Sequence, residues 1–230
     1  MSFTMAIKQI LRRFGIDIVR YRPFWKTMVP RNIKTIIDIG ASDGVFAKEM
    51  RARFPEASIY SFEPLHDAYE RLQITMQGDK KFHAFNMALG LESGETIINR
   101  SSSTPSSSLL TMAELHKTLY PKSASHTKEK IQIEKLDTVL GNRDLEKPVL
   151  VKIDVQGFED KVIQGGRNVI GNADIAIIET SFTTLYENQP LFGDIHDLMR
   201  ILNFSYRGRY ETHYSERTGE PIYEDSVYTK

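Results

Sequence analysis

The chain has 230 residues, which is enough for one domain with a sizeable core, or for one domain with additions. Its 30 basic and 30 acidic residues balance, and this argues against nucleic acid as a partner, because such binding draws on an excess of cations. The sequence contains no cysteine. A disulfide, a cysteine zinc site and a thiol nucleophile are therefore excluded.

Residues 1–32 are predicted to form a helical N-terminal extension. In "MAIKQILRRF" (5–14) the apolar side chains fall on one helical face, and residues 8–34 carry eight basic residues against one acid, Asp17. The extension could pack over the domain, cover an anionic substrate or make peripheral contact with an anionic membrane surface. No stretch approaches the roughly 20 apolar residues that cross a bilayer, and basic residues interrupt the only candidate signal peptide. We expect a cytoplasmic protein.

The segment "TIIDIGASDGVFAKEM" (35–50) predicts a strand, a glycine turn and a helix. Its first five residues are β-branched and apolar apart from Asp38, as in a strand buried on both faces of a parallel sheet. The turn runs from Gly40 to Gly44, and turns of this kind bring backbone close to a nucleotide. The feature to explain is Asp38, an acid near the end of an apolar strand.

Strands and helices are predicted to alternate along the rest of the chain. We expect strands at residues 57–64, 81–89, 95–100, 128–136, 149–156 and 173–182, an edge strand in "SVYTK" (226–230), and helices at 65–76, 109–118, 158–166 and 193–204. This rhythm predicts an α/β fold, a doubly wound and mostly parallel sheet, with ligands bound beyond the carboxyl ends of its strands. We assign residues 33–230 to this domain and treat 91–135 as an insertion on the acceptor side.

The glycine turn favours S-adenosylmethionine over a dinucleotide. The pattern Asp38-x-Gly40-x-x-x-Gly44 lacks the middle glycine of the dinucleotide fingerprint, and an acid is a poor neighbour for two phosphates. It is a better neighbour for an ammonium group, which S-adenosylmethionine carries. Glu63, 19 residues beyond Gly44 at the end of the second strand, can accept both ribose hydroxyls. A chance turn with a buried, capped Asp38 is the alternative.

Seven segments lie in order within residues 33–182: "TIIDIGASDGVFA", "IYSFEP", "NMALG", the serine run before "LL", "LDTVL", "LVKIDVQGFE" and "IAIIETSF". Together they resemble the FkbM family of S-adenosylmethionine-dependent methyltransferases. The resemblance implies a class I methyltransferase (Rossmann-like) fold, in which the last of seven strands is antiparallel. It also implies O-methylation of a hydroxyl on a sugar, glycan or secondary metabolite. The cofactor-binding residues that we carry over are Asp38, Gly40, Ala41, Ser42, Gly44, Glu63, Asn86, Met87 and Ala88.

Three acids near strands four and five are the candidate catalytic residues. Asp154 ends strand four, Glu159 begins the following helix and Glu179 ends strand five. A hydroxyl acceptor usually needs a base or a metal ion to lose its proton as it attacks. Asp154 is then either that base or, with Glu179, a ligand for Mg²⁺. A buried ion pair between Asp154 and Lys152, which share one side of the strand, and a capping role for Glu179 are the structural alternatives.

Two further groups of residues stay ambiguous. His116, His126 and His213 lie outside the matched core, where solvated loop histidines are the usual case, although one of them could serve as a base. Ser106–Ser108 belong either to a flexible linker or to a loop that binds the acceptor.

Two other functions compete with methyl transfer at this stage. They are a nicotinamide-dependent oxidoreductase and a non-catalytic S-adenosylmethionine-binding protein. The sequence leaves open the acceptor, the need for a metal, the identity of the base and the oligomeric state.

Overall fold

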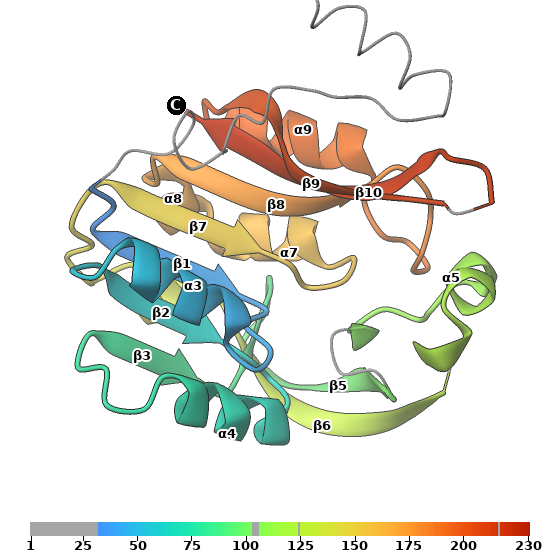
Figure 1. Ribbon diagram of the computed structural model, residues 1–230, viewed down its shortest axis with the longest axis horizontal. Coiled ribbons are helices and arrows are strands. Elements are labelled where there is room, and N and C mark those ends of the chain that lie inside the picture. The colour runs from blue at the N-terminus through green and yellow to red at the C-terminus, as the bar shows by residue number, and fades with distance from the viewer. Residues whose placement is uncertain (1–31, 103–105, 124, 216) are drawn as a thin grey trace, which may run out of the picture. The chain divides into compact units, whose positions relative to one another are not determined.

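The structure is a computed structural model, and it describes residues 32–102, 106–123, 125–215 and 217–230. Its main feature is a seven-stranded sheet with the order β3-β2-β1-β7-β8-β10-β9 (Figure 1). The bounds of these strands are Phe82–Phe85 (β3), Ser58–Phe62 (β2), Thr35–Ile39 (β1), Val149–Ile153 (β7), Ile175–Ser181 (β8), Pro221–Thr229 (β10) and Ser205–Tyr214 (β9). The first five are mutually parallel, and β10 runs antiparallel to both of its neighbours. The α/β class and the antiparallel last strand are thereby confirmed.

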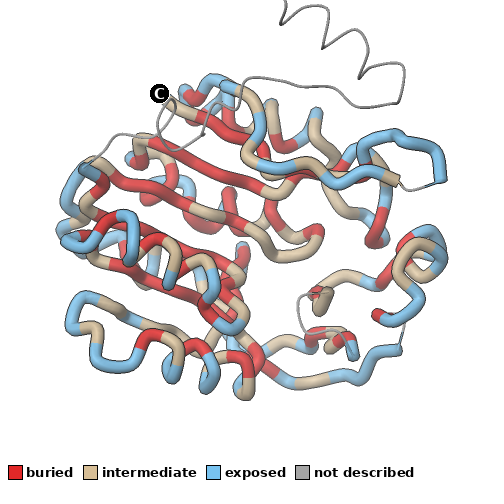
Figure 2. Tube along the Cα trace, in the orientation of Figure 1, coloured by how far each residue is buried: buried red, intermediate tan, exposed pale blue. Residues whose placement is uncertain are grey.

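The central strands are buried because helices cover both faces of the sheet (Figure 2). Every residue of β1 is buried, as its β-branched sequence predicts. Figure 1 shows α3 in front of β1 and β2 and α7 behind the sheet. The helices are α3 (Val45–Arg53), α4 (His66–Thr75), α6 (Leu136–Leu140), α7 (Glu159–Gly165), α8 (Arg167–Gly171) and α9 (Phe192–Ile201).

The strand predicted at 81–89 is wrong as a single element. It divides into β3 and β4 (Ala88–Leu89), and β4 belongs to a second sheet of order β4-β6-β5. The division occurs at Asn86, whose side-chain amide donates to the carbonyl oxygens of Glu63 and Pro64, each at 2.9 Å. These bonds hold the chain beside the end of β2 and turn it out of the main sheet.

The region expected as an insertion, residues 91–135, supplies most of the second sheet. It contains β5 (Gly94–Ser101), α5 (Glu114–Leu119), the short 3-10 helix η2 (Pro121–Ser123) and β6 (His126–Glu134). Figure 1 shows this sheet beyond the carboxyl ends of β2 and β3. The helix predicted at 109–118 begins only at Glu114.

The C-terminal strand is not an edge strand, contrary to the sequence prediction. β10 lies between β8 and β9, and its residues Val227 and Tyr228 are fully buried. The edge position belongs to β9, "SYRGRYETHY", which the prediction missed because its residues are mostly polar and alternate between half-buried and exposed. The helix expected within residues 5–14 lies outside the described residues, and its contact with a membrane stays a prediction.

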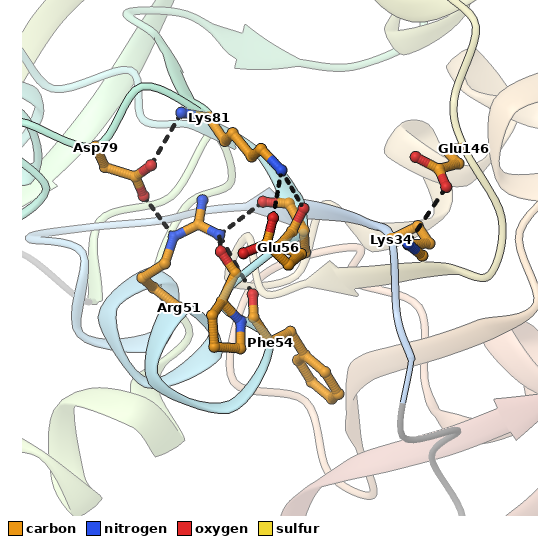
Figure 3. A network of polar contacts seen from close by, with 9 residues as sticks. Lys34, Arg51, Phe54, Glu56, Asp79, Lys81 and Glu146 are labelled. Carbon is orange, nitrogen blue, oxygen red and sulfur yellow. Dashed lines mark hydrogen bonds and ion pairs between the residues drawn. The ribbon is translucent and has the colours of Figure 1, made fainter.

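Ion pairs link the loops at the amino-terminal edge of the main sheet (Figure 3). The pairs are Arg51–Asp79 at 2.6 Å, Lys81–Glu56 at 2.9 Å and Lys34–Glu146 at 3.5 Å. The Arg51 guanidinium also donates to the carbonyl oxygens of Phe54, Pro55 and Ala57. At this edge each of these acids faces one cation. Among the described helices, none has the length and apolar character needed to cross a membrane.

Candidate active site

A pocket opens at the opposite, carboxyl-terminal edge of the sheet. Its empty space, counted together with the solvent at its mouth, measures ≈ 690 Å³. Residues that follow β1, β2 and β7 line it, together with β4 and part of the serine run. The pocket therefore lies where ligands of doubly wound sheets bind.

Gly40 permits a close approach of two strands at the base of the pocket. Its φ of +81° is in the left-handed region, and a Cβ there would lie 1.9 Å from the carbonyl oxygen of Asp154. The amide of Asp154 in turn donates to the carbonyl of Ile39 at 3.0 Å. Gly40 also lines the pocket, but glycine is required here mainly because the ends of β1 and β7 come so close together.

The remaining turn residues divide between the pocket wall and the protein interior. Ser42 lines the pocket, whereas Ala41 and Gly44 do not. A Cβ on Gly44 would lie 2.8 Å from Leu72 Cδ1, so this glycine serves the packing of α3 against α4. Of the four turn residues that the sequence analysis predicted to bind the cofactor, Gly40 and Ser42 therefore lie at the pocket.

Glu63 lies on the pocket wall with both carboxylate oxygens already oriented. One oxygen accepts the amide of Ser42 and the other that of Leu65, each at 2.9 Å. A carboxylate has about four acceptor positions, so Glu63 can still accept two hydroxyl groups. Burial raises the pKa of Glu63 to about 7, against the opposing effect of the two amides.

The Asn86–Ala88 segment, expected near an adenine, has two roles. Met87 and Ala88 line the pocket together with Phe62 and Leu65, and these side chains supply apolar surface. Asn86 does not line it, because both hydrogens of its amide are donated to backbone carbonyls. The apolar part of the wall suits a flat heteroaromatic ring.

Asp38 is completely buried beneath the pocket rather than in its wall. Ser61 Oγ donates to one of its oxygens at 3.4 Å, and the other oxygen has no partner among the described residues. Burial raises its pKa to about 6, while neighbouring Lys152 acts in the opposite direction. Because Asp38 has no surface in the pocket, this unsatisfied acceptor fits only the water-mediated form of the contact with a cationic group that the sequence analysis assigned to it.

Asp154 and Glu179 are brought together by one intervening side chain. The amide nitrogen of Gln156 donates to Asp154 Oδ1 at 2.9 Å and to Glu179 Oε1 at 3.1 Å. Lys152 Nζ lies 3.0 Å from the other oxygen of Asp154, so the expected ion pair also exists. Asp154 lines the pocket, and its side chain is 30% exposed. Burial, followed by repulsion from Asp154, raises the pKa of Glu179 well above its ordinary value.

Asp225 lies near Asp154 and Glu179, and the sequence analysis did not predict it. Paired positions place Asp38 opposite Lys152, Lys152 opposite Ile177, and Glu179 opposite Asp225, which puts the three acids and the lysine on one face of the sheet. Burial raises the pKa of Asp225 to about 6. Its signal was hidden because the sequence did not predict that β10 pairs with β8.

Glu159 has contacts that favour a structural role over the direct catalytic role expected from the sequence. Its Oε1 accepts the amides of Val155 and Gly157, each at 3.1 Å, and the residue is buried away from the pocket wall. Burial raises its pKa to about 7. The carboxylate therefore holds the loop that carries Asp154.

Within Ser106–Ser108 the last two residues form part of the pocket wall, so the flexible-linker interpretation does not hold for Ser107 and Ser108. Ser108 Oγ donates to the carbonyl of Gln156 at 2.6 Å and accepts the amide of Leu110 at 3.0 Å, so its single proton is not available to an acceptor molecule. The acceptor-binding alternative for Ser107 stays a prediction.

The expectation of solvated histidines is wrong for His116. Its side chain is buried against Tyr120 and Tyr186, and Nε2 lies 3.0 Å from Ser123 Oγ. Burial lowers its pKa. His126 and His213 are exposed. Within the described part of the chain no three histidine, aspartate or glutamate residues are arranged to hold a metal ion, and Mg²⁺ stays untested.

The strand order with its antiparallel last strand, and the pocket at the sheet's carboxyl edge, are those expected of the class I methyltransferase fold. The sequence pattern of the Methyltransferase FkbM domain matches residues 38–206, and the chain belongs to this family. It is therefore a methyltransferase and not a nicotinamide-dependent oxidoreductase.

Similar proteins extend this comparison. The chain is 26% identical over 209 residues to "2-O-methyltransferase NoeI" of Sinorhizobium fredii (strain NBRC 101917 / NGR234), with 85% of each chain covered. Among solved structures, StiE O-MT has a TM-score of 0.49 at 9% identity, covering 96% of this chain and 74% of the other. An rRNA methylase from Streptococcus thermophilus has a TM-score of 0.48 at 8% identity, covering 93% and 99%.

Proposed function

We propose that this protein transfers the methyl group of S-adenosylmethionine to a hydroxyl of a sugar or glycan, with small secondary metabolites as the second candidate class. The observation that carries the proposal is the partly exposed carboxylate of Asp154 on the wall of the pocket. The similarity to a protein named as a 2-O-methyltransferase supports oxygen as the methylated atom.

The residues present fit the cofactor along the length of the pocket. Glu63 would accept the ribose hydroxyls, and Met87 and Ala88 would cover the adenine. The turn at Gly40 and Ser42, with the unpartnered oxygen of Asp38 beneath it, would hold the amino-acid end. When bound, the cofactor supplies a methyl group activated by its sulfonium.

Asp154 would act as the base for the acceptor hydroxyl. As the hydroxyl oxygen forms its bond to the methyl carbon and the carbon–sulfur bond breaks, the hydroxyl proton passes to a carboxylate oxygen of Asp154. Lys152, whose Nζ lies 3.0 Å from Oδ2, keeps that carboxylate oriented. Much of the remaining catalysis comes from holding the two reacting groups in line.

The charge around Asp154 favours a neutral acceptor over an anionic one. Glu179 and Asp225 lie near Asp154, with Lys152 as the cation among them. Carboxylates accept hydrogen bonds from hydroxyl groups but repel phosphates. We therefore expect an unphosphorylated sugar to be methylated in preference to a sugar phosphate.

The test uses tritium-labelled S-adenosylmethionine and a panel of acceptors. The panel contains methyl glycosides of hexoses, 6-deoxyhexoses and pentoses, together with catechol and glucose 6-phosphate. We expect label in at least one neutral glycoside and none in the sugar phosphate. Label confined to catechol would move the acceptor to another class. Cofactor binding without transfer to any member of a wider glycan panel would contradict the proposal.

A further inference from the structure

The loop between β7 and α7 is held in a single conformation from several sides. Gln156 has a φ of +57°, which is uncommon for a residue other than glycine. Its carbonyl accepts a hydrogen bond from Ser108 Oγ at 2.6 Å. The amides on either side of it, those of Val155 and Gly157, both donate to Glu159. Backbone strain that is retained with this much support is typical of functional sites.

The side chain of Gln156 joins three polar groups. Both hydrogens of its amide nitrogen are used, one on Asp154 and one on Glu179, at 2.9 and 3.1 Å. Its amide oxygen accepts the hydroxyl of Tyr186 at 2.9 Å, which is nearer than the other acceptor of that hydroxyl, the carbonyl oxygen of Ser106 at 3.2 Å. The opposite orientation of the amide would turn its oxygen towards the Asp154 carboxylate, which is paired with Lys152 and can accept but not donate. The Tyr186 hydroxyl therefore reinforces the orientation that the acids require.

We infer that Gln156 is a positioning residue, which fixes Asp154 and Glu179 relative to one another, and that Tyr186 acts on the acids through Gln156. Two carboxylates this close repel one another, and a shared amide donor offsets the repulsion while restricting both side chains. The inference rests on the proposed role of Asp154 and extends it to a second layer of residues. Tyr186 is 2% exposed, so it acts from the protein interior.

The first experiment replaces Gln156 by methionine, which has a similar length but no amide. With the glycoside identified in the tritium assay, we expect kcat to fall by about 10²-fold, because a small misplacement of a reacting group has an effect of that size. The affinity for S-adenosylhomocysteine, measured by calorimetry, should change by less than about threefold. Gln132→Met, at an exposed glutamine of β6, is the matched control and should match wild type. Unchanged kcat in Gln156→Met would overturn the inference.

A double-mutant cycle tests the route from Tyr186. Tyr186→Phe removes one oxygen and should lower kcat in the wild-type protein, but it should have no further effect in Gln156→Met, because its partner is gone. An equal fold-reduction in both backgrounds would show that Tyr186 acts independently. If Gln156→Met does not fold, Tyr186→Phe alone still tests the inference. A fall in kcat with an unchanged KM would support it, and an unchanged kcat would contradict it.

A third measurement needs no acceptor and separates this inference from the proposed function. The titration of Glu179 can be followed by carbon-13 NMR of the side-chain carboxyl groups. The groups that face it are Asp154, Glu159, Asp225, Lys152, Tyr120, Tyr186 and Tyr223. Because an amide donor favours the charged carboxylate, Gln156→Met should shift the Glu179 midpoint to higher pH, and Gln132→Met should not. An unshifted midpoint would overturn the inference, even if the protein methylates a glycoside. A shifted midpoint would support the inference, even if the protein methylates no glycoside.

Discussion

The two edges of the main sheet differ in how many cations accompany their acidic residues. At the amino-terminal edge Glu56, Asp79 and Glu146 each lie beside one cation (Figure 3). At the carboxyl-terminal edge four acids share Lys152, and these acids are Asp38, Asp154, Glu179 and Asp225. Paired surface charges require little further explanation. An excess of buried acids costs stability, and such groups concentrate where a protein binds or reacts.

The pKa of one acid at the amino-terminal edge, Glu56, moves in the opposite direction to the pKa values of the buried acids at the carboxyl-terminal edge. A hydrogen bond from Lys81 lowers the pKa of exposed Glu56. Burial instead raises the pKa of Glu63 to about 7 and that of Asp225 to about 6. The carboxyl edge therefore contributes acids whose protonation changes near neutral pH, where a ligand can alter it.

The largest expected effect comes from two glycines with almost the same conformation at opposite edges. Gly40 has a φ of +81° and Gly78 a φ of +85°, but only at Gly40 would a Cβ meet another atom, Asp154 O at 1.9 Å. Gly78→Ala should lower the free energy of unfolding by about 1 kcal/mol through conformation alone. Gly40→Ala should lower it by about 3 kcal/mol, because the end of β7 must also move.

Chemical denaturation measures both glycine variants, and calorimetry with S-adenosylhomocysteine measures their cofactor site. We expect Gly78→Ala to bind as wild type does and Gly40→Ala to bind more weakly. Equal stability of the two variants would mean that the ends of β1 and β7 are not in the contact described above.

Glu63→Gln tests the ribose end of the pocket. We expect it to weaken S-adenosylmethionine binding by about 1–3 kcal/mol at pH 8, because hydrogen bonds to a charged acceptor are lost. With a pKa of about 7, wild-type Glu63 is protonated as pH falls, so wild-type affinity should decrease below pH 7 and that of the variant should stay level. Glu49→Gln, on the surface of α3, is the control. An unchanged dissociation constant in Glu63→Gln would remove this residue from the cofactor site.

Asp225→Asn tests how much unfolding free energy the protein loses when this buried acid at the carboxyl-terminal edge becomes charged. The pKa of Asp225 is raised to about 6, so its contribution to stability is present at low pH and is lost as pH rises through that value. Between pH 4 and pH 8 we expect the variant to gain about 2 kcal/mol of unfolding free energy relative to wild type. Asp197→Asn, at an exposed position of α9, should show no such gain. A variant that loses stability at pH 8 would indicate that Lys152 already neutralises Asp225.

Lys81→Ala should have the smallest effect. The Lys81–Glu56 pair is exposed, with side-chain exposures of 49% and 80%. We expect the free energy of unfolding to change by less than about 0.5 kcal/mol, and cofactor affinity not to change. Chemical denaturation at low and high salt checks this, and a loss as large as that of Gly40→Ala would contradict the contrast between the two edges.

Local patterns carried most of the fold prediction. The strand at 35–39, its glycine turn and the acids at 154 and 179 could be read from short stretches of sequence, because burial and turn conformation leave local signals. The edge strand β9 and the division at Asn86 could not, since both depend on contacts with distant segments.

The same distinction applies to the candidate site. Glu63, Ser42 and Asp154 were predicted to lie near a ligand, and all three line one pocket. Asp225 was missed because its place follows from the register of β10 on β8. The contacts of Gln156 with Tyr186 join positions 30 residues apart, and no spacing rule connects them.

Asp154→Asn tests most directly the claim that the acids of the carboxyl edge perform methyl transfer. On the glycoside identified in the tritium assay we predict that turnover falls by about 10²-fold or more, because asparagine keeps the shape but cannot take the proton. S-adenosylhomocysteine affinity and melting temperature should match wild type, and EDTA should leave wild-type turnover unchanged if Asp154 is a base and abolish it if Asp154 binds a metal ion. Wild-type turnover in Asp154→Asn, or a large fall in melting temperature with loss of cofactor binding, would contradict the catalytic assignment.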